Sequence, residues 1–167
     1  MHARRDDTMR GAPQGVVERF LPPPEAALVR TCFAGLWALD GDDAEQVIAM
    51  ALADPSAFVL KPQREGGGNN LYGENMVARL QQRAGLGAFI LMQRIRPPVN
   101  RALFMRAGVA APADALCELG IYSVYMRVRG AVARNTAVGH LLRTKTADSN
   151  EGGVAAGFAV LDSPLLV

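Results

Sequence analysis

The stretch FVLKPQREGGGNNLYG occupies residues 58–73 of the 167-residue chain. It begins inside a short continuous apolar run, Ala57–Leu60, which is typical of a buried strand. At Lys61 the sequence turns polar and passes through three consecutive glycines into Glu74–Gln82, where apolar residues recur at helical spacing. We therefore predict a strand, a glycine-rich loop and a helix in direct succession. The side chains of Met76, Val77 and Leu80 are expected to face the core from this helix.

Helical patterns dominate before this stretch, and strand patterns dominate after it. Helices are predicted at 15–20, from Pro24 or Glu25 onward, and after an N-cap at Asp42 or Asp43. The inward face of the second of these helices is expected to hold Ala27, Leu28, Thr31, Cys32 and Leu36, with Trp37 in the core near its end. The inward face of the third is expected to hold Val47, Ile48, Ala51 and Leu52.

Strand patterns are found at 88–93, 116–128, around Val132 and at 154–161. Within 116–128, the apolar positions include Leu119, Ile121 and Val124. Helices first, followed by strands with interspersed helices, are typical of an α+β or α/β protein, and we expect α+β.

The total charge of +2 hides an uneven distribution. Residues 1–60 carry five basic and nine acidic side chains, 61–145 carry thirteen and four, and 146–167 carry none and three. A near-neutral total does not indicate a nucleic-acid or membrane-surface protein, so we expect neither partner. The cationic middle segment is either a solvated arginine-rich face or an anion site, and the count does not decide between them.

The residues of the glycine-rich loop leave two interpretations open. One is a structural or flexible linker, and the other is a loop whose backbone amides approach an anion closely. A place between a strand and a helix is typical of phosphate-binding loops, although the loop matches neither the P-loop nor the dinucleotide-binding motif. The cation of Lys61, the carboxylate of Glu65 and an open backbone together fit a magnesium–nucleotide polyphosphate, and Asn70 adds a neutral polar group.

A second cluster of candidate residues follows at 139–145. If this segment is extended, Arg143 and Lys145 share one face because side chains alternate along a strand. Arg143 could then bind a carboxylate and Lys145 a phosphate, or both could be solvated charges at a strand edge. The Gly- and Ala-rich residues after Glu151 form either a mobile cover or tight packing. His140, flanked by apolar residues, is assigned a structural role.

Lysine is rare in this chain. Only two of the eighteen basic residues are lysines, and Lys61 and Lys145 lie one in each candidate segment. A sequence that uses arginine wherever either cation suffices keeps lysine where a compact ammonium is required. We infer that these two positions require an ammonium group.

The cysteines and the terminal residues bear on the compartment. Cys32 and Cys117 lie far apart and form no metal-binding or redox motif, which favours a reducing compartment. The longest apolar run, Gly152–Leu161, has ten residues, fewer than a membrane-spanning helix requires. The first residues contain no apolar segment of the kind found in secretory signals. We expect a cytoplasmic protein.

Residues 58–73 closely resemble the glycine-rich loop of eukaryotic-type glutathione synthetase, an ATP-grasp ligase. Residues 139–145 and 152–157 resemble the alanine-rich lid region of that family, and 118–121 and 159–162 are also similar to it. The resemblance extends from about Phe20 to Val167. It implies an ATP-grasp-type α+β fold with an antiparallel or mixed sheet and flanking helices, present in part. We expect a loose N-terminus at 1–13 and part of the ATP-grasp region at 14–167, including a glycine-rich loop at 61–73 and an alanine-rich lid loop at 146–157.

The resemblance also implies roles for individual residues. Lys61 and Lys145 contact the phosphates, Glu65 is a Mg²⁺ ligand, and Arg143 binds the carboxylate of the peptide substrate. Beside the peptide lie Val154 and Ala155. The implied ATP-binding residues are Lys61, Pro62, Gln63, Arg64, Glu65, Gly66, Gly67, Gly68, Asn69, Asn70, Tyr72, Met92, Gln93, Arg94, Ile95, Glu118, Lys145 and Glu151.

Three of these positions differ from the common family pattern. Gln93 and Arg94 stand where glutamate and lysine are common, and Glu151 stands where aspartate is usual. Because Met92–Ile95 corresponds to a segment whose backbone holds adenine, we expect the first two changes to be tolerated. Glu118 corresponds to a nucleotide contact at the ribose.

The implied reaction joins γ-glutamylcysteine and glycine into glutathione, with ATP as co-substrate and Mg²⁺ as cofactor. Family members are much longer and are commonly homodimers, so we expect a C-terminal fragment with little or no activity alone. A non-catalytic remnant that binds nucleotide or serves as an interaction module is the alternative.

Overall fold

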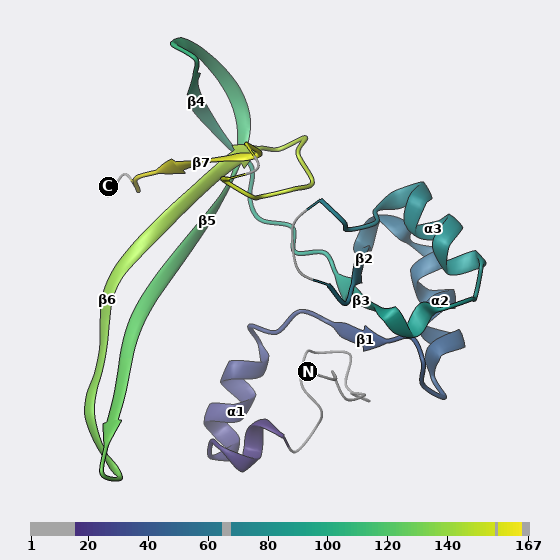
Figure 1. Cartoon of the computed structure of the whole chain (residues 1–167), viewed down its shortest axis with the longest axis horizontal. Helices are drawn as coiled ribbons and strands as arrows, with labels where there is room; N and C mark the ends of the chain where they lie inside the picture. Colours follow the sequence, from purple (N-terminus) through teal and green to yellow (C-terminus); the bar gives the residue numbers. More distant parts are fainter. Residues whose placement is uncertain (1–15, 65–67, 156, 165–167) are drawn as a thin grey trace. The chain divides into compact units, whose positions relative to one another are not determined.

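The structure is a computed structural model that describes residues 16–64, 68–155 and 157–164. The chain divides into two compact units, Met1–Ile95 and Arg96–Val167. The first unit contains helices and a small sheet, and the second consists of antiparallel strands (Figure 1). The expected α+β class is therefore confirmed. No helix among the described residues is long and apolar enough to cross a membrane.

The sheet of the first unit has three antiparallel strands in the order β1-β3-β2. The strands are β1 (Leu36–Ala38), β2 (Phe58–Pro62) and β3 (Phe89–Gln93). The predictions at 57–60 and 88–93 are thus confirmed within one residue at their starts. Short 3-10 turns, η2 (Pro55–Ala57) and η3 (Leu86–Ala88), lead directly into β2 and β3.

Two helices pack their apolar faces into the same core as the sheet. Helix α2 (Ala44–Ala53) contributes Val47, Ile48 and Ala51, and α3 (Gly73–Gln81) contributes Met76 and Leu80. These faces are the predicted ones, although Leu52 and Val77 are only partly buried. Strand residues complete the core with Trp37, Phe58, Leu60 and Leu91. Truncating a fully buried leucine of this core to alanine should cost about 2–5 kcal/mol.

A helix is present where one was predicted from Pro24 or Glu25, but its predicted extent and inward face are wrong. Helix α1 (Pro23–Arg30) ends before Thr31, and of its residues only Ala26 is buried, whereas Leu28 is 70% exposed. The Thr31 hydroxyl donates to the Leu28 carbonyl at 2.7 Å, and the chain then leaves the helix. Ala27, Thr31 and Cys32, also predicted to face inward, are exposed as well. Leu36, the last residue of the predicted face, is partly buried but belongs to β1 rather than to the helix.

Trp37 belongs to the core, as predicted, but it lies in β1 rather than near a helix end. Its ring meets that of Phe58 edge-on, with 5.7 Å between the centroids. Gly35 makes this packing possible, because a Cβ atom there would lie 2.1 Å from the indole ring. Before α1, a 3-10 turn, η1 (Val17–Arg19), replaces the helix predicted at 15–20.

The second unit is a four-stranded antiparallel sheet in the order β4-β5-β6-β7. Its strands are β4 (Asn100–Arg106), β5 (Val109–Val128), β6 (Ala131–Thr146) and β7 (Ala159–Asp162). The sequence prediction missed β4, began β5 seven residues late and placed the start of β7 too early. The extents of β4, β5 and β6 follow from two tight turns, Ala107-Gly108 and Arg129-Gly130, whose residues all have positive φ. Such two-residue turns match the twist of antiparallel hairpins.

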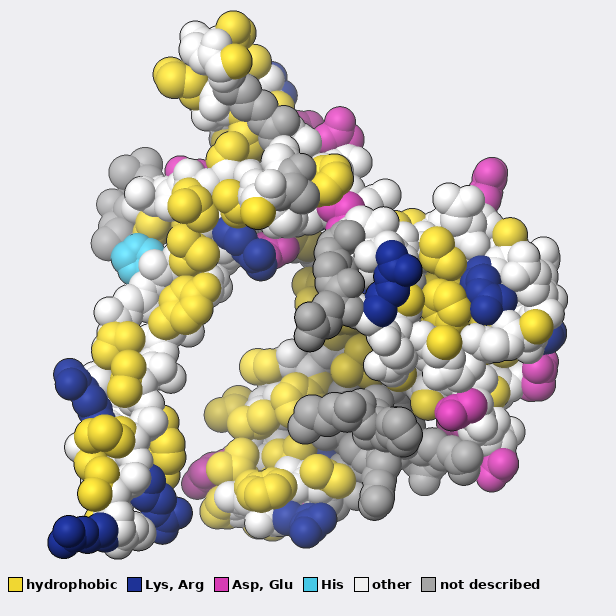
Figure 2. All heavy atoms as spheres, in the orientation of Figure 1, with side chains coloured by type: hydrophobic (Ala, Val, Ile, Leu, Met, Phe, Trp, Pro, Cys, Tyr) yellow, Lys and Arg dark blue, Asp and Glu magenta, His cyan; other side chains and the backbone are white. Residues whose placement is uncertain are grey.

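The outer part of the β5–β6 hairpin carries exposed apolar side chains. Figure 2 shows hydrophobic side chains along this ribbon. Leu119 and Ile121, two of the predicted apolar strand positions, are 55% and 65% exposed. The buried residues of β6 and β7 lie where β6 is flanked by both neighbours, and Ala115 of β5 lies between β4 and β6, since a two-stranded ribbon alone packs little. Among the residues of this unit that the structure describes, the buried ones are Phe104, Ala115, Leu142, Thr144 and Ala159.

Candidate functional site

Lys61 lies at the point where β2 leaves the core. Phe58, Val59 and Leu60 are buried, and Lys61 is exposed while still paired with Ile90 in the sheet. The strand ends at Pro62, which cannot donate a backbone hydrogen bond. The ammonium group is therefore presented to solvent from a rigid strand end.

The glycine-rich loop is closed at its base by backbone hydrogen bonds. Leu60 and Leu71 exchange both bonds, with N···O distances of 3.0 and 2.9 Å. Within the loop, Gln63 donates its backbone N–H to the Ala88 carbonyl at 2.8 Å, and Arg64 hydrogen-bonds the side chain of Asn69. The ends of the loop are thus fixed by the sheet and by η3.

The described part of the loop has an open backbone. Gly68 has φ of +79°, in the left-handed region, and nothing lies within 4 Å of where its Cβ would be. A side chain at this position would be strained, and glycine also leaves the backbone accessible. Glu65, Gly66 and Gly67, for which a metal-ligand role and phosphate contacts were predicted, lie outside the described residues.

Tyr72 and Arg94 form one local group at the start of α3. The Arg94 guanidinium lies 5.4 Å from the centroid of the Tyr72 ring, in a cation–π contact. Asn70 contacts the Tyr72 hydroxyl through its amide nitrogen at 3.4 Å. The structure therefore brings together three predicted nucleotide-binding residues from two segments.

The Met92–Ile95 segment is held by hydrogen bonds that the sequence did not reveal. Gln93 donates its N–H to the Gly35 carbonyl at 2.8 Å, and its side-chain Oε1 accepts from the Gly35 N–H at 3.1 Å. Arg94 donates its N–H to the Ala57 carbonyl at 2.8 Å. These two N–H groups are therefore already used within the fold, whereas Ile95 is 71% exposed.

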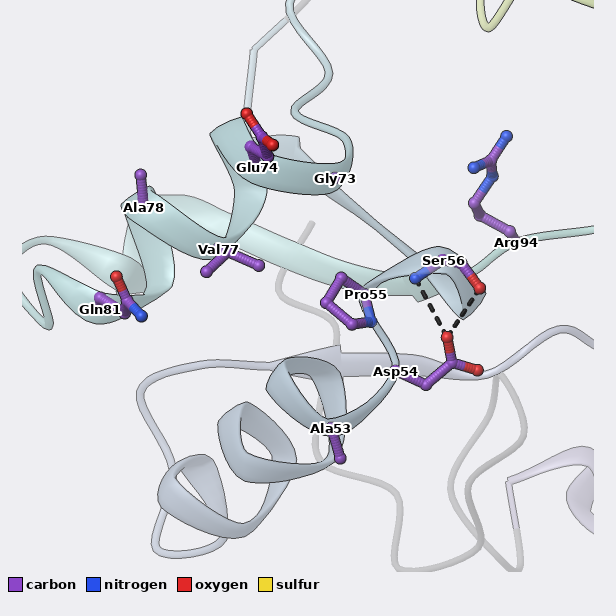
Figure 3. A pocket seen from close by; sticks show the side chains of 10 residues that line it. All are labelled: Ala53, Asp54, Pro55, Ser56, Gly73, Glu74, Val77, Ala78, Gln81 and Arg94. Carbon is purple, nitrogen blue, oxygen red and sulfur yellow. Dashed lines mark hydrogen bonds between the residues drawn. The ribbon is translucent and has the colours of Figure 1, made fainter.

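An open pocket of about 620 Å³ lies beside this segment, and the sequence prediction missed it. Figure 3 shows that the Asp54 carboxylate turns back to Ser56. Its Oδ1 accepts hydrogen bonds from the Ser56 backbone N–H at 3.2 Å and from the Ser56 hydroxyl at 2.7 Å. The Asp-Pro-Ser sequence, typical of a side-chain-stabilised turn, was the available signal. The lining residues are Ala53, Asp54, Pro55, Ser56, Gly73, Glu74, Val77, Ala78, Gln81 and Arg94.

In the second unit, Arg143 and Lys145 share one face of β6, as predicted. Leu142 and Thr144, which alternate with them, are buried on the other face. Arg143 lies directly opposite Glu118 on β5, and Nη2 of the guanidinium forms an ion pair with Oε2 of the carboxylate. Two residues assigned to different ligands are therefore bonded to each other.

A buried threonine holds the strand that carries these charged residues. Thr144 is 1% exposed, and its hydroxyl donates to Asp162 Oδ2 on β7 at 2.8 Å. The same hydroxyl lies 3.5 Å from the Cys117 sulfur on β5. Because Thr144 contacts both neighbouring strands, the backbone that carries Arg143 and Lys145 is fixed.

The predicted lid loop begins after β6 and leads to β7. Ser149 donates its hydroxyl to the Glu151 carbonyl at 3.0 Å, and the Gly157 N–H donates to the Val154 carbonyl at 2.9 Å. A Cβ atom added at Gly152 would lie 3.4 Å from Glu118 Oε1, so the loop backbone lies against this carboxylate. Of the remaining predicted residues, Val154 is partly buried and Ala155 is exposed.

The candidate residues thus form two local groups, one within each unit. Within the described ranges, no three His, Cys, Asp or Glu side chains gather as a metal-binding cluster. His140 lies exposed on β6 opposite Ile121, and its structural role stays a prediction.

Comparisons with known proteins show which family the chain is similar to. The family model described as eukaryotic glutathione synthase, ATP binding domain, matches residues 11–166. The chloroplastic glutathione synthetase of Arabidopsis thaliana is 50% identical over 162 residues, which cover 93% of this chain and 30% of the relative. Human glutathione synthetase is 50% identical over 157 residues, covering 90% and 33% respectively. The chain therefore spans about a third of the length of these relatives.

A solved structure of a related protein has a similar fold. The glutathione synthetase-like effector GSS30 of Globodera pallida, in its apo form, superposes with a TM-score of 0.64 and 27% identity, covering 92% of this chain and 32% of that one. The two antiparallel sheets with few helices agree with an ATP-grasp-type fold that is present in part. The chain belongs to the eukaryotic glutathione synthase family, whose ATP-binding-domain model it matches over residues 11–166.

Proposed function

We propose that these residues serve in an ATP-dependent glutathione synthase, which joins γ-glutamylcysteine to glycine and releases ADP and phosphate. A carboxylate is a poor electrophile, so ATP converts it into an acyl phosphate, from which the glycine amine displaces phosphate. The reaction is proposed for the whole enzyme, since the chain spans about a third of its relatives. The observation that carries the proposal is the family match over residues 11–166.

The glycine-rich loop is assigned to the phosphates of ATP. Lys61 supplies a compact positive charge at the strand end, and the backbone amides of 66–70 cover the phosphates, with glycine at the first three of these five positions. The hydrogen bonds between Leu60 and Leu71 support this assignment, because a fixed base lets the loop meet the phosphates at little ordering cost. Positioning and charge neutralisation then lower the barrier to phosphoryl transfer.

The Tyr72–Arg94 group and Met92–Ile95 are assigned to the nucleoside. Because the N–H groups of Gln93 and Arg94 already bond Gly35 and Ala57, adenine is read by other groups of this segment. The exposed side chain of Ile95 offers an apolar surface for the base.

The second unit is assigned to the peptide and to further phosphate contacts. Arg143 binds the carboxylate of γ-glutamylcysteine through its guanidinium, with Val154 and Ala155 beside the peptide. Lys145 meets a phosphate, while Glu118 and Glu151 contact the nucleotide. The loop at 146–157 serves as a lid that excludes water, which would otherwise hydrolyse the acyl phosphate.

Mg²⁺ belongs to the proposal as the ion that accompanies ATP. Glu65 is the candidate ligand, and it lies outside the described residues. The described residues offer no cluster of three or more metal-binding side chains. Mg²⁺ is usually held by one or two carboxylates together with phosphates and water, and Glu65 would supply one such carboxylate. When bound, it would neutralise phosphate charge.

Two further assignments concern the whole enzyme. We assign it to the cytoplasm, although the Arabidopsis relative carries the name chloroplastic, and we expect a homodimer without a nucleic-acid or membrane partner. The family match over residues 11–166 favours the ligase over the alternative of a non-catalytic interaction module.

The proposal is tested by calorimetric titration of the purified chain with a magnesium complex of a non-hydrolysable ATP analogue. Lys61→Ala should weaken binding about tenfold, because a charge-assisted hydrogen bond to phosphate is lost. Arg134→Ala, which removes an exposed cation from the outer β6 strand, is the matched control and should leave affinity unchanged. If Lys61→Ala behaves like the control, the phosphate role of Lys61 is refuted.

A second measurement addresses the reaction. Phosphate release is followed with γ-glutamylcysteine and glycine, together and singly. We expect nucleotide binding with little or no turnover by the chain alone. Release that requires both substrates would confirm the ligase reaction and refute the expected inactivity, and a chain that binds no nucleotide would refute the proposed function.

A further inference from the structure

The ion pair between Glu118 and Arg143 has the geometry of a positioning contact. The two residues are directly opposite each other on β5 and β6. Their side chains are 48% and 44% exposed, so a ligand can reach both. The contact joins Nη2 of the guanidinium to Oε2 of the carboxylate. Since a guanidinium has five N–H donors, Arg143 keeps donors for a second carboxylate while bonded to the first.

The register of the hairpin places these residues opposite each other. Val128 pairs with Ala131 across the turn, and an unbroken ladder from there would place Arg143 opposite Leu116. Two irregularities, between Tyr122 and Ser123 and between Met126 and Arg127, each insert one residue in β6. Together they shift the pairing by two residues and bring Glu118 opposite Arg143. Bulges often re-aim side chains beside functional sites.

Contacts around the ion pair fix the backbone of β6, so only the side chain of Arg143 can adjust its orientation. Thr144 holds β6 to β7 through its bond with Asp162 at 2.8 Å. The carboxylate of Glu118 is flanked on its other oxygen by Gly152, whose added Cβ would lie 3.4 Å away. Glu118 is thus held between Arg143 and the loop backbone.

From these contacts we propose that Glu118 is a positioning residue for Arg143, which it orients toward the carboxylate of γ-glutamylcysteine. The inference rests on the proposed function and adds to the nucleotide contact assigned to Glu118. An arginine that is already oriented loses less side-chain freedom when it binds. Glu118 therefore strengthens dipeptide binding even when no nucleotide is present.

The test measures γ-glutamylcysteine binding to the full chain by calorimetry without nucleotide. Glu118→Gln should weaken this binding about three- to tenfold, which corresponds to the cost of ordering one long side chain. Asp114→Asn is the matched control, because Asp114 lies on the same strand and pairs with Arg101 at 3.1 Å in an exposed contact of the same kind. The control should leave dipeptide affinity unchanged.

A double-mutant cycle tests whether Glu118 acts through Arg143. In an Arg143→Lys background, which has no guanidinium to orient, Glu118→Gln should have no further effect on dipeptide binding. A purely structural contribution would instead give the same loss in both backgrounds. Thermal unfolding of each variant verifies that the fold persists.

The outcomes separate this inference from the proposed function. Unchanged dipeptide affinity in Glu118→Gln, with weaker nucleotide binding, would overturn the positioning role and leave the nucleotide contact standing. Tighter dipeptide binding would show that Glu118 competes for Arg143, which also overturns the role. A wild-type chain that binds neither nucleotide nor dipeptide would refute the proposed function and the inference with it.

Discussion

Replacing Gly35 by alanine should strongly destabilise the first unit, because the added methyl group has no space beside Trp37. A Cβ atom at this position would lie 2.1, 2.7 and 2.8 Å from three atoms of the Trp37 ring. Contacts this short cannot persist, so either the indole or the strand must move. Trp37 is buried to 7% exposure and packs against Phe58, which leaves little room for such a shift.

The magnitude follows from the cost of overpacking a core, about 1–3 kcal/mol and occasionally more. We expect the upper end of this range, because Gly35 also exchanges two hydrogen bonds with Gln93 that a displaced strand would lengthen. Trp37 is the only tryptophan of the chain, so its fluorescence during urea unfolding reports on the first unit directly. The measured quantity is the difference in free energy of unfolding from the wild type.

Gly139→Ala is the matched control for this prediction. Gly139 lies in β6, its φ is outside the left-handed region, and nothing lies within 4 Å of its added Cβ. Its substitution should change the free energy of unfolding by less than about 0.5 kcal/mol, followed by circular dichroism because Gly139 lies in the second unit and Trp37 in the first. If Gly35→Ala costs no more than the control, the packing of Trp37 over Gly35 is not as described, and the reasoning fails.

Two further predictions concern buried or partly buried hydrogen bonds. Thr144→Val removes the hydroxyl bonded to Asp162 and should lower the free energy of unfolding by about 1–2 kcal/mol, measured by thermal unfolding. The loss is no larger because the exposed carboxylate of Asp162 regains a hydrogen bond from water. A loss below about 0.5 kcal/mol, typical of an ordinary surface change, would contradict this role. Gln93→Ala leaves the Gly35 N–H without its acceptor and should lower the free energy of unfolding in urea by about 1 kcal/mol. Gln93→Glu supplies another acceptor at the same place and should cost little. Equal losses in both variants would contradict the hydrogen-bond explanation.

The parts of the fold that the sequence predicted well are those specified by neighbouring residues. Val47, Ile48 and Ala51 recur at helical spacing and are buried in α2. Lys61 follows three buried residues and marks the strand end. Local spacing therefore located the strand–loop–helix unit and the glycine-rich loop, because each of these features is decided within about ten residues of chain.

The failures arise where distant residues decide the outcome. The α1 segment has apolar residues at helical spacing, yet Leu28 is exposed. Trp37 lies in a strand rather than near a helix end, because its neighbours Leu36 and Ala38 pair with Met92 and Ile90, far along the chain. Strand β4 was missed since the preceding Pro97-Pro98 suggested only a break. Its pairing with β5 depends on the turn at Ala107-Gly108, in which a non-glycine residue adopts positive φ.

The Glu118–Arg143 pair shows why part of the site could not be read from spacing. Alternation along β6 correctly predicted that Arg143 and Lys145 share a face. The partner across the sheet depends on register, and register here depends on two single-residue insertions that no local pattern announced. One insertion alone would turn Arg143 toward the opposite face relative to β5, because side chains alternate with a period of two residues. The second insertion restores the face and moves the partner by two residues, from Leu116 to Glu118. The chemistry of the site is thus set jointly by a charged motif that the sequence displays and by irregularities in the strand pairing that only the folded hairpin reveals.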